Sequence, residues 1–211
     1  MLIIVIICDL VKISLMFVFL RSKFQKSQYL GQNWGSFKVE IGKWISKMLM
    51  IFRGDNQLGA VGAVAIDSNG HVACATSTGI TGKVPGRVGD TPLAGAGGYC
   101  DDMIGGCSAT GHGEAIARVC LCRHITGLMD AGMDPKGATE KALNYMLKRT
   151  GETGGAITVS NKGDIGLHFT SDRMPWAYVK NDEVHYGVHL QHEYVETLNE
   201  LSFDSAWKFL I

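Results

Sequence analysis

Short runs of small and β-branched residues, separated by turn signals, recur along this chain and predict strands. Small and β-branched residues cover 61–66 and 71–76, and Asp67-Ser68-Asn69-Gly70 lies between them as a turn signal. Further short apolar runs occur at 104–108, 156–160, 165–169 and 183–188. We therefore predict strands at these six places, with a loop rich in glycine and proline over 79–98.

The middle of the chain changes to a helical period. Apolar residues at spacings of three and four predict a helix over 114–129, which ends before Gly132. Asp134 is a natural N-cap and Pro135 suits the first helical position, so a second helix begins there. Strands, two helices and strands again predict an α+β domain with both helices on one face of a mostly antiparallel sheet.

The first 20 residues are apolar enough for a membrane span. Asp9 and Lys12 interrupt them, each at a cost of roughly 2.5–3.5 kcal/mol near a bilayer centre. No basic region precedes the apolar run, which disfavours a signal peptide. A membrane anchor over 1–20 and a segment unrelated to the domain both remain open. Residues 21–58 show no repeat or strong period and stay unassigned.

Composition narrows the classes of function. The formal net charge is zero and no basic block is present, which disfavours nucleic-acid binding. Glycines gather between Gly54 and Gly113, where short turns would bring backbone close to a ligand. The six cysteines have no CxxC pair, which favours reduced thiols over a disulfide or zinc framework. We expect no cofactor, no metal and a cytoplasmic location, with membrane anchoring as the alternative.

Several motifs follow one another from residue 59. They are Gly59-Ala60-Val61-Gly62, Thr76-Ser77-Thr78-Gly79, Gly86-Arg87-Val88-Gly89-Asp90 and Thr110-Gly111-His112-Gly113-Glu114. In this order they resemble the threonine-dependent asparaginase and isoaspartyl peptidase family of N-terminal nucleophile hydrolases. The resemblance implies a β-subunit-like domain over 59–193, which is part of an αββα four-layer sandwich, followed by a tail over 194–211.

The resemblance also identifies a missing reactive group. In this family a threonine after glycine cuts the chain in front of itself. Its hydroxyl then attacks the substrate while its freed amine takes the proton. The matching autocleavage position here is Gly59-Ala60, and Ala60 has no hydroxyl. Val61 cannot replace it, so the resemblance implies an inactive or strongly impaired homologue.

The resemblance gives roles to two groups upstream of the helices. Thr78 corresponds to the threonine that orients the nucleophile, and a bond to local backbone is the alternative. Arg87 and Asp90, with Val88 and Gly89 between them, correspond to the residues that bind the substrate's carboxylate and amine. A guanidinium can fork onto a carboxylate, and an acidic group suits an ammonium. An exposed loop ion pair is the alternative for Arg87 and Asp90.

The loop before the first helix has matching roles. The Thr110 hydroxyl and the Gly111 N–H correspond to the donors that stabilise the oxyanion. His112 and Gly113 correspond to the remaining substrate contacts. His112 and Glu114 do not suit a metal site, because residues two apart do not lie side by side on a helix. The histidines in 185–192 have no Cys or carboxylate cluster beside them, so we interpret them as surface residues.

Two further departures from the family pattern shape the functional expectation. The stretch 78–83 is one residue shorter than usual, and residues 1–58 do not resemble the family's α region. One hypothesis is an inactive homologue that still binds L-asparagine or β-aspartyl peptides. The alternative is a non-enzymatic binding or regulatory subunit, membrane-tethered or paired with itself or a family member. A partial gene product is the third reading.

Overall fold

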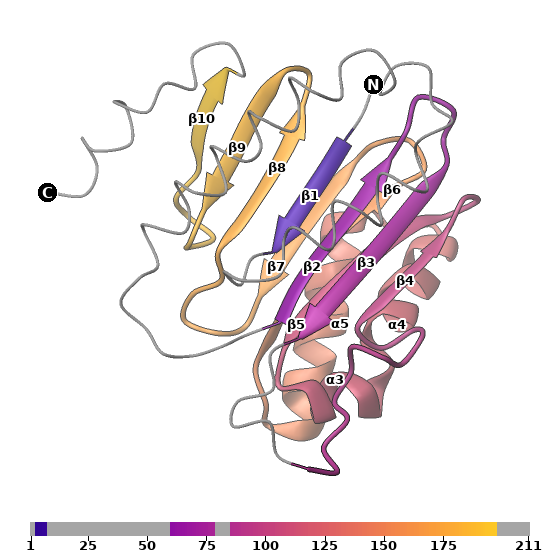
Figure 1. The fold of residues 1–211 in the computed structure, drawn as a ribbon, viewed down its shortest axis with the longest axis vertical. Coiled ribbons are helices and arrows are strands. Elements are labelled where there is room, and N and C mark those ends of the chain that lie inside the picture. Colours follow the sequence, from indigo (N-terminus) through magenta and orange to yellow (C-terminus); the bar gives the residue numbers. More distant parts are fainter. Residues whose placement is uncertain (1–2, 8–59, 79–84, 198–211) are drawn as a thin grey trace, which may run out of the picture.

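The computed structural model describes residues 3–7, 60–78 and 85–197 as two stacked sheets with helices on one of them (Figure 1). The larger, sheet A, has the order β10 (Tyr194–Thr197), β9 (Glu183–Gly187), β8 (Trp176–Lys180), β1 (Ile3–Ile7), β2 (Ala60–Ile66) and β3 (Val72–Thr78). Sheet B has the order β4 (Gly98–Asp101), β5 (Gly105–Gly111), β6 (Gly154–Ser160) and β7 (Ile165–Phe169).

Three helices cover the face of sheet B that points away from sheet A (Figure 1). They are α3 (Gly113–Val119), α4 (Leu121–Asp130) and α5 (Pro135–Thr150). Paired strands within both sheets run antiparallel. The predicted α+β class and the placement of helices on one sheet face are confirmed, and the described residues form three layers.

The prediction of one continuous helix over 114–129 is wrong. Cys120 adopts a left-handed conformation with φ 46° and divides the stretch into α3 and α4. The break lets the first turn of α4 meet the loop before β4, where the Arg123 N–H donates to the Gly95 carbonyl at 2.8 Å. N–H groups at a helix start lack partners within the helix, so this loop satisfies one of them. Hydrophobic spacing could not indicate the break.

Four strands have no predicted counterpart. β4 begins at the end of the predicted loop over 79–98, β8 lies between the strands predicted at 165–169 and 183–188, and β10 lies in the predicted tail. β1 occupies residues 3–7 of the possible anchor and pairs with β2 and β8. Residues 8–20 and 21–58 lie outside the described residues, so the predictions for them stay untested. No helix among the described residues is long and apolar enough to cross a membrane.

Side chains of β6 alternate between the two cores, as a buried strand requires. Ile157 and Val159 pack between the sheets in a cluster that includes Val64, Phe169 and Trp176. The intervening residues of β6 face the helices instead. There the buried hydroxyl of Thr158 lies 2.7 Å from that of Thr139 on α5. These two cores fix sheet B between its neighbours and hold the end of β5 in place.

Candidate active site

One end of the stacked sheets gathers segments that are distant in sequence (Figure 1). β2 begins at Ala60, and strand pairing places Ala60 opposite Thr78 at the end of β3. From the other sheet, the Thr110 hydroxyl donates to the Ala60 carbonyl at 3.3 Å, across 50 residues of sequence. The structure therefore brings Ala60, Thr78 and Thr110 together from three strands in two sheets.

The chemistry available at position 60 follows from this placement. Ala60 is half-buried and its side chain ends in a methyl group, so it supplies no nucleophile. Thr110 is half-buried too, and its hydroxyl donates a hydrogen bond to the backbone carbonyl of position 60. Gly59 and the side chain of Thr78 lie outside the described residues, so the autocleavage bond and the orienting role of Thr78 stay predictions.

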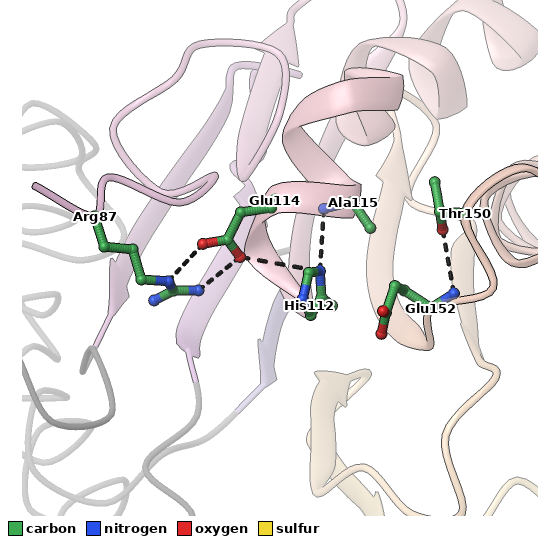
Figure 2. Close-up of polar contacts among 6 residues, drawn as sticks. All are labelled: Arg87, His112, Glu114, Ala115, Thr150 and Glu152. Atoms are coloured by element: carbon green, nitrogen blue, oxygen red, sulfur yellow. Dashed lines mark hydrogen bonds and ion pairs between the residues drawn. The ribbon is translucent and has the colours of Figure 1, made fainter. Parts of the chain in front are cut away.

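Arg87 and Glu114 form a two-point ion pair at the start of α3 (Figure 2). Arg87 Nε donates to Glu114 Oε1 at 2.6 Å, and Arg87 Nη2 donates to Oε2 at 2.9 Å. The hydrogen bond from Arg87 is the main cause that lowers the pKa of Glu114 to about 2, and Glu114 in turn raises the pKa of Arg87. Sequence reasoning missed this partner, because the two residues are 27 positions apart.

Asp90 is buried beside that pair, with 5% of its surface exposed. Its Oδ2 atom has no hydrogen-bond partner among the described residues. Burial raises the pKa of Asp90, while its backbone hydrogen bond and the charge of Arg87 act in the opposite direction. The alternative interpretation, an exposed Arg87–Asp90 loop pair, therefore does not describe this loop. Arg87 binds Glu114, and Asp90 lies inside.

Gly113 has no side chain, and this leaves room for Asp90 and Arg87 to approach the same point of the backbone. A Cβ at position 113 would lie 2.7 Å from Asp90 Oδ1 and 3.3 Å from Arg87 Nη2. Both polar atoms therefore flank the same small space above the backbone of α3. Between them in sequence, Val88 is exposed and Gly89 lies under the guanidinium, with 3.9 Å from its would-be Cβ to Arg87 Cζ. The loop 87–90 and the start of α3 thus form one cluster.

His112 caps α3 and lies on the other side of Glu114 (Figure 2). Its Nδ1 accepts from the Ala115 N–H at 3.3 Å and lies 3.9 Å from Glu114 Oε2. The prediction that His112 and Glu114 are not neighbours is wrong, because His112 is the cap and not a helical residue. No group of three His, Cys, Asp or Glu in the described part of the chain could hold a metal ion.

The histidines in 185–192 differ in their exposure. His189 and His192 are exposed as predicted, but only 17% of the His185 side chain is exposed. β8 and β9 pair Tyr178 with His185, whose rings stack at 4.4 Å, and His185 Nδ1 lies 2.7 Å from Glu193 Oε1. The surface reading is therefore wrong for His185. None of the described cysteines, Cys74, Cys100, Cys107, Cys120 and Cys122, forms a disulfide with another, and Cys8 lies outside the described residues.

We predict that Arg87→Ala raises the pKa of Glu114 from about 2 towards its ordinary value near 4.5. A carboxylate with a lowered pKa stabilises the fold above its unfolded pKa, and this contribution disappears as the pH decreases from 4.5 to 2. The Arg87 side chain is 32% exposed and the Glu114 side chain is 45% exposed, so solvent screens the pair. Its contribution to the free energy of unfolding is therefore below about 1 kcal/mol. Carboxyl ¹³C NMR titration measures the pKa. Arg149→Ala is the charge-matched control, and an unchanged Glu114 titration in Arg87→Ala contradicts the assignment.

Comparisons with known proteins bear on the same residues. The family model described as asparaginase (Asparaginase_2) matches residues 21–188. This match starts upstream of Gly59, the boundary expected from the motifs. The isoaspartyl peptidase/L-asparaginase of Xenopus laevis is 51% identical over 133 residues, which are 63% of this chain and 43% of that protein. The Homo sapiens protein of the same name is 48% identical over 132 residues, 62% of this chain and 43% of that protein.

A third relative extends the comparison to insects. The probable isoaspartyl peptidase/L-asparaginase CG7860 of Drosophila melanogaster is 49% identical over 130 residues, 61% of this chain and 39% of that protein. The chain thus spans less than half the length of these curated relatives. The family-model match nevertheless covers most of the chain, and the chain belongs to the asparaginase family.

Proposed function

We propose that this chain is a pseudoenzyme of its family, which binds aspartyl ligands but does not hydrolyse them. The ligand class is L-asparagine and β-aspartyl (isoaspartyl) peptides, in line with the names of its relatives. The observation that carries the proposal is Ala60 at the head of β2, bonded through its carbonyl to Thr110. The proposed complete fold is the αββα four-layer sandwich, in which sheets A and B and the helices supply three layers.

The binding half of the site supports this proposal. Arg87 offers a fixed cation for a ligand carboxylate, and Asp90 offers a buried carboxylate for an ammonium, on two sides of Gly113. A ligand carbonyl oxygen would replace the Ala60 carbonyl as the acceptor of the Thr110 hydroxyl, with the Gly111 N–H as the second donor. Without a hydroxyl at position 60 no acyl-enzyme forms. In a serine protease, loss of the nucleophile lowers kcat by about 10⁶-fold.

The proposal is tested with the full 211-residue chain. We expect it to release neither ammonia from L-asparagine nor L-aspartate from a β-aspartyl dipeptide above background. We expect NMR titration with L-aspartate to shift the amide signals of the 87–90 loop and of 110–114. The Xenopus laevis relative, assayed in parallel, is the positive control. Turnover comparable to that of the relative refutes the proposal, and the absence of aspartate-dependent shifts refutes its binding half.

A second candidate function is a non-enzymatic subunit that pairs with a copy of itself or with an intact family member. Among the described strands, β3 and β10 each have a neighbour on one side only, and open strand edges favour pairing with another chain. Size-exclusion chromatography with and without the Xenopus laevis relative tests this function. Carbonate extraction distinguishes the proposed cytoplasmic location from a membrane tether through residues 1–20.

We predict that Gly113→Ala weakens L-aspartate binding by about tenfold with little loss of stability. The new Cβ would stand 2.7 Å from Asp90 Oδ1 and push the carboxylate and the guanidinium apart. In α3 the same change favours the helix by up to about 1 kcal/mol, which offsets the contact. Isothermal calorimetry and thermal unfolding measure the two effects.

Gly137→Ala is the matched control for this prediction. It lies in the first turn of α5, and its new Cβ would stand 2.8 Å from the capping carboxylate of Asp134. We expect it to leave aspartate affinity unchanged. Equal loss of affinity in the two variants would contradict the placement of the ligand beside Gly113.

A further inference from the structure

We propose that Glu114 is a positioning residue that holds Arg87 with one edge turned to the ligand and selects for α-amino carboxylates. The inference rests on the proposed function, since it concerns the same ligand site. It assigns a role to a residue that the motif pattern does not include among the ligand contacts. Glu114 contacts Arg87 and is not itself placed against the ligand.

The geometry of the ion pair divides the guanidinium into two edges. Glu114 engages the edge formed by Nε and Nη2, at 2.6 and 2.9 Å (Figure 2). A guanidinium carries five N–H donors in a planar fork, so the edge formed by Nη1 and Nη2 keeps its own pair of donors. A ligand carboxylate can bind that second edge while Glu114 holds the first. Arg87 then binds two carboxylates at once, one from the protein and one from the ligand.

Other contacts fix the direction of the free edge. Gly89 lies beneath the guanidinium, with both Nη atoms within about 4 Å of its would-be Cβ position (3.9 and 4.0 Å). Nη2 and Asp90 Oδ1 flank the same point above Gly113. A ligand carboxylate on the free edge therefore brings its α-substituent towards Asp90. Asp90 Oδ1 is the carboxylate oxygen next to this space and would accept from an ammonium group on that substituent, whereas the unpartnered Oδ2 lies towards Gly97.

The charges of Arg87, Glu114 and Asp90 make the proposed site selective for ligands that carry an ammonium group. Arg87 alone would attract any anion, and a dianion most strongly. Glu114 compensates the charge of Arg87, so the pair is neutral and Asp90 adds a negative charge. The low pKa of Glu114, about 2, keeps the pair ionised across the working range of pH. The site therefore favours L-aspartate, which carries an ammonium group, over succinate, which has the same carboxylates without it.

The first arm of the test needs no ligand. In the ¹⁵N-labelled full chain at neutral pH, we expect the Arg87 Nε–H signal to be observed and to exchange slowly with water. Glu114→Gln should shift the signal and speed its exchange, because one of the two charge-assisted bonds is lost. Glu152→Gln is the control. It removes the same charge from the loop near His112, where the Glu152 N–H bonds to Thr150 Oγ1 at 3.2 Å (Figure 2).

The second arm measures selectivity by calorimetry with L-aspartate and succinate. We expect Glu114→Gln to reduce the ratio of their association constants by about tenfold, and Glu152→Gln to leave it unchanged. A purely structural role would weaken both ligands equally and leave the ratio as it was. Circular dichroism and thermal unfolding confirm that each variant is folded.

The outcomes separate the two proposals. If the wild-type chain binds L-aspartate and Glu114→Gln keeps the same ratio, the role of Glu114 is overturned while the proposed function stands. An Arg87 signal that ignores Glu114→Gln overturns it without reference to any ligand. If the Arg87 Nε–H signal depends on Glu114 but the wild type binds no L-aspartate, the proposed function fails. The proposed selectivity then fails as well, because it rests on that function.

Discussion

Restoring a threonine at position 60 is expected to restart self-cleavage in a chain that also carries an upstream region of the family. The suitable protein is a chimera in which residues 60–188 of this chain, with Ala60→Thr, follow the upstream part of the Xenopus laevis relative. The new hydroxyl can attack the carbonyl of the preceding glycine, so that an ester forms as the amide bond before position 60 breaks and the amine is freed. Water then hydrolyses the ester and separates the two fragments, and the free amine can serve as the base in turnover. We expect two fragments on a denaturing gel and a new N-terminus at position 60 by mass spectrometry.

Two variants of the same chimera control for folding and shape. The chimera with Ala60 unchanged should stay in one piece. Ala60→Val introduces the shape of threonine without its hydroxyl, and it should also stay uncut. A single band from the Ala60→Thr chimera, in a folded protein, would count against the assignment of position 60.

The 211-residue chain makes a further comparison. Because this chain spans less than half the length of its curated relatives, we predict that Ala60→Thr in this chain alone does not restore turnover. Cleavage in the chimera but not in the 211-residue chain would separate the contribution of the hydroxyl from that of the upstream region. Equal cleavage in both would show that the hydroxyl alone is limiting.

Local patterns were enough to predict much of the fold. The turn at residues 67–70 and the runs on either side predicted β2 and β3, because strand and turn propensities act over a few residues. Asp134 and Pro135 likewise predicted the start of α5, where Asp134 accepts from the Gly137 N–H at 2.9 Å. The break at Cys120 depends instead on a loop that is hydrogen-bonded to the start of α4, and hydrophobic spacing cannot indicate such a partner.

The candidate site depends on contacts over long distances in sequence, which no local pattern predicts. The bond from Thr110 to Ala60 spans 50 residues, and only the family resemblance placed these two residues in one site. The pair of Arg87 with Glu114 spans 27 residues, and the resemblance did not include it. An arginine in a loop and a glutamate at a helix start are each common on protein surfaces. Their pairing becomes visible only when strand β5 and helix α3 are placed.

Replacement of Gly111 by alanine is expected to destabilise the domain by about 4 kcal/mol. Gly111 has φ +130°, which residues with a side chain rarely adopt. It also pairs with Gly154 across β5 and β6, and a Cβ at position 111 would lie 2.5 Å from the Gly154 Cα and 2.8 Å from the Thr153 carbonyl oxygen. These atoms belong to backbone held within sheet B, so they cannot move aside as a flexible side chain can. Backbone strain and overpacking each cost about 1–3 kcal/mol.

Gly151→Ala separates the two causes of that loss. Gly151 ends α5 with φ +75°, but no atom lies within 4 Å of its would-be Cβ, so its replacement should cost about 1 kcal/mol through backbone conformation alone. Urea unfolding of the full chain measures both variants. A loss for Gly111→Ala no larger than that for Gly151→Ala would mean that β6 can shift away from β5 at this point. The Gly111 N–H would then not be held in place for a ligand oxygen, and the loop 110–113 would lose the rigidity that a site for a carbonyl oxygen requires.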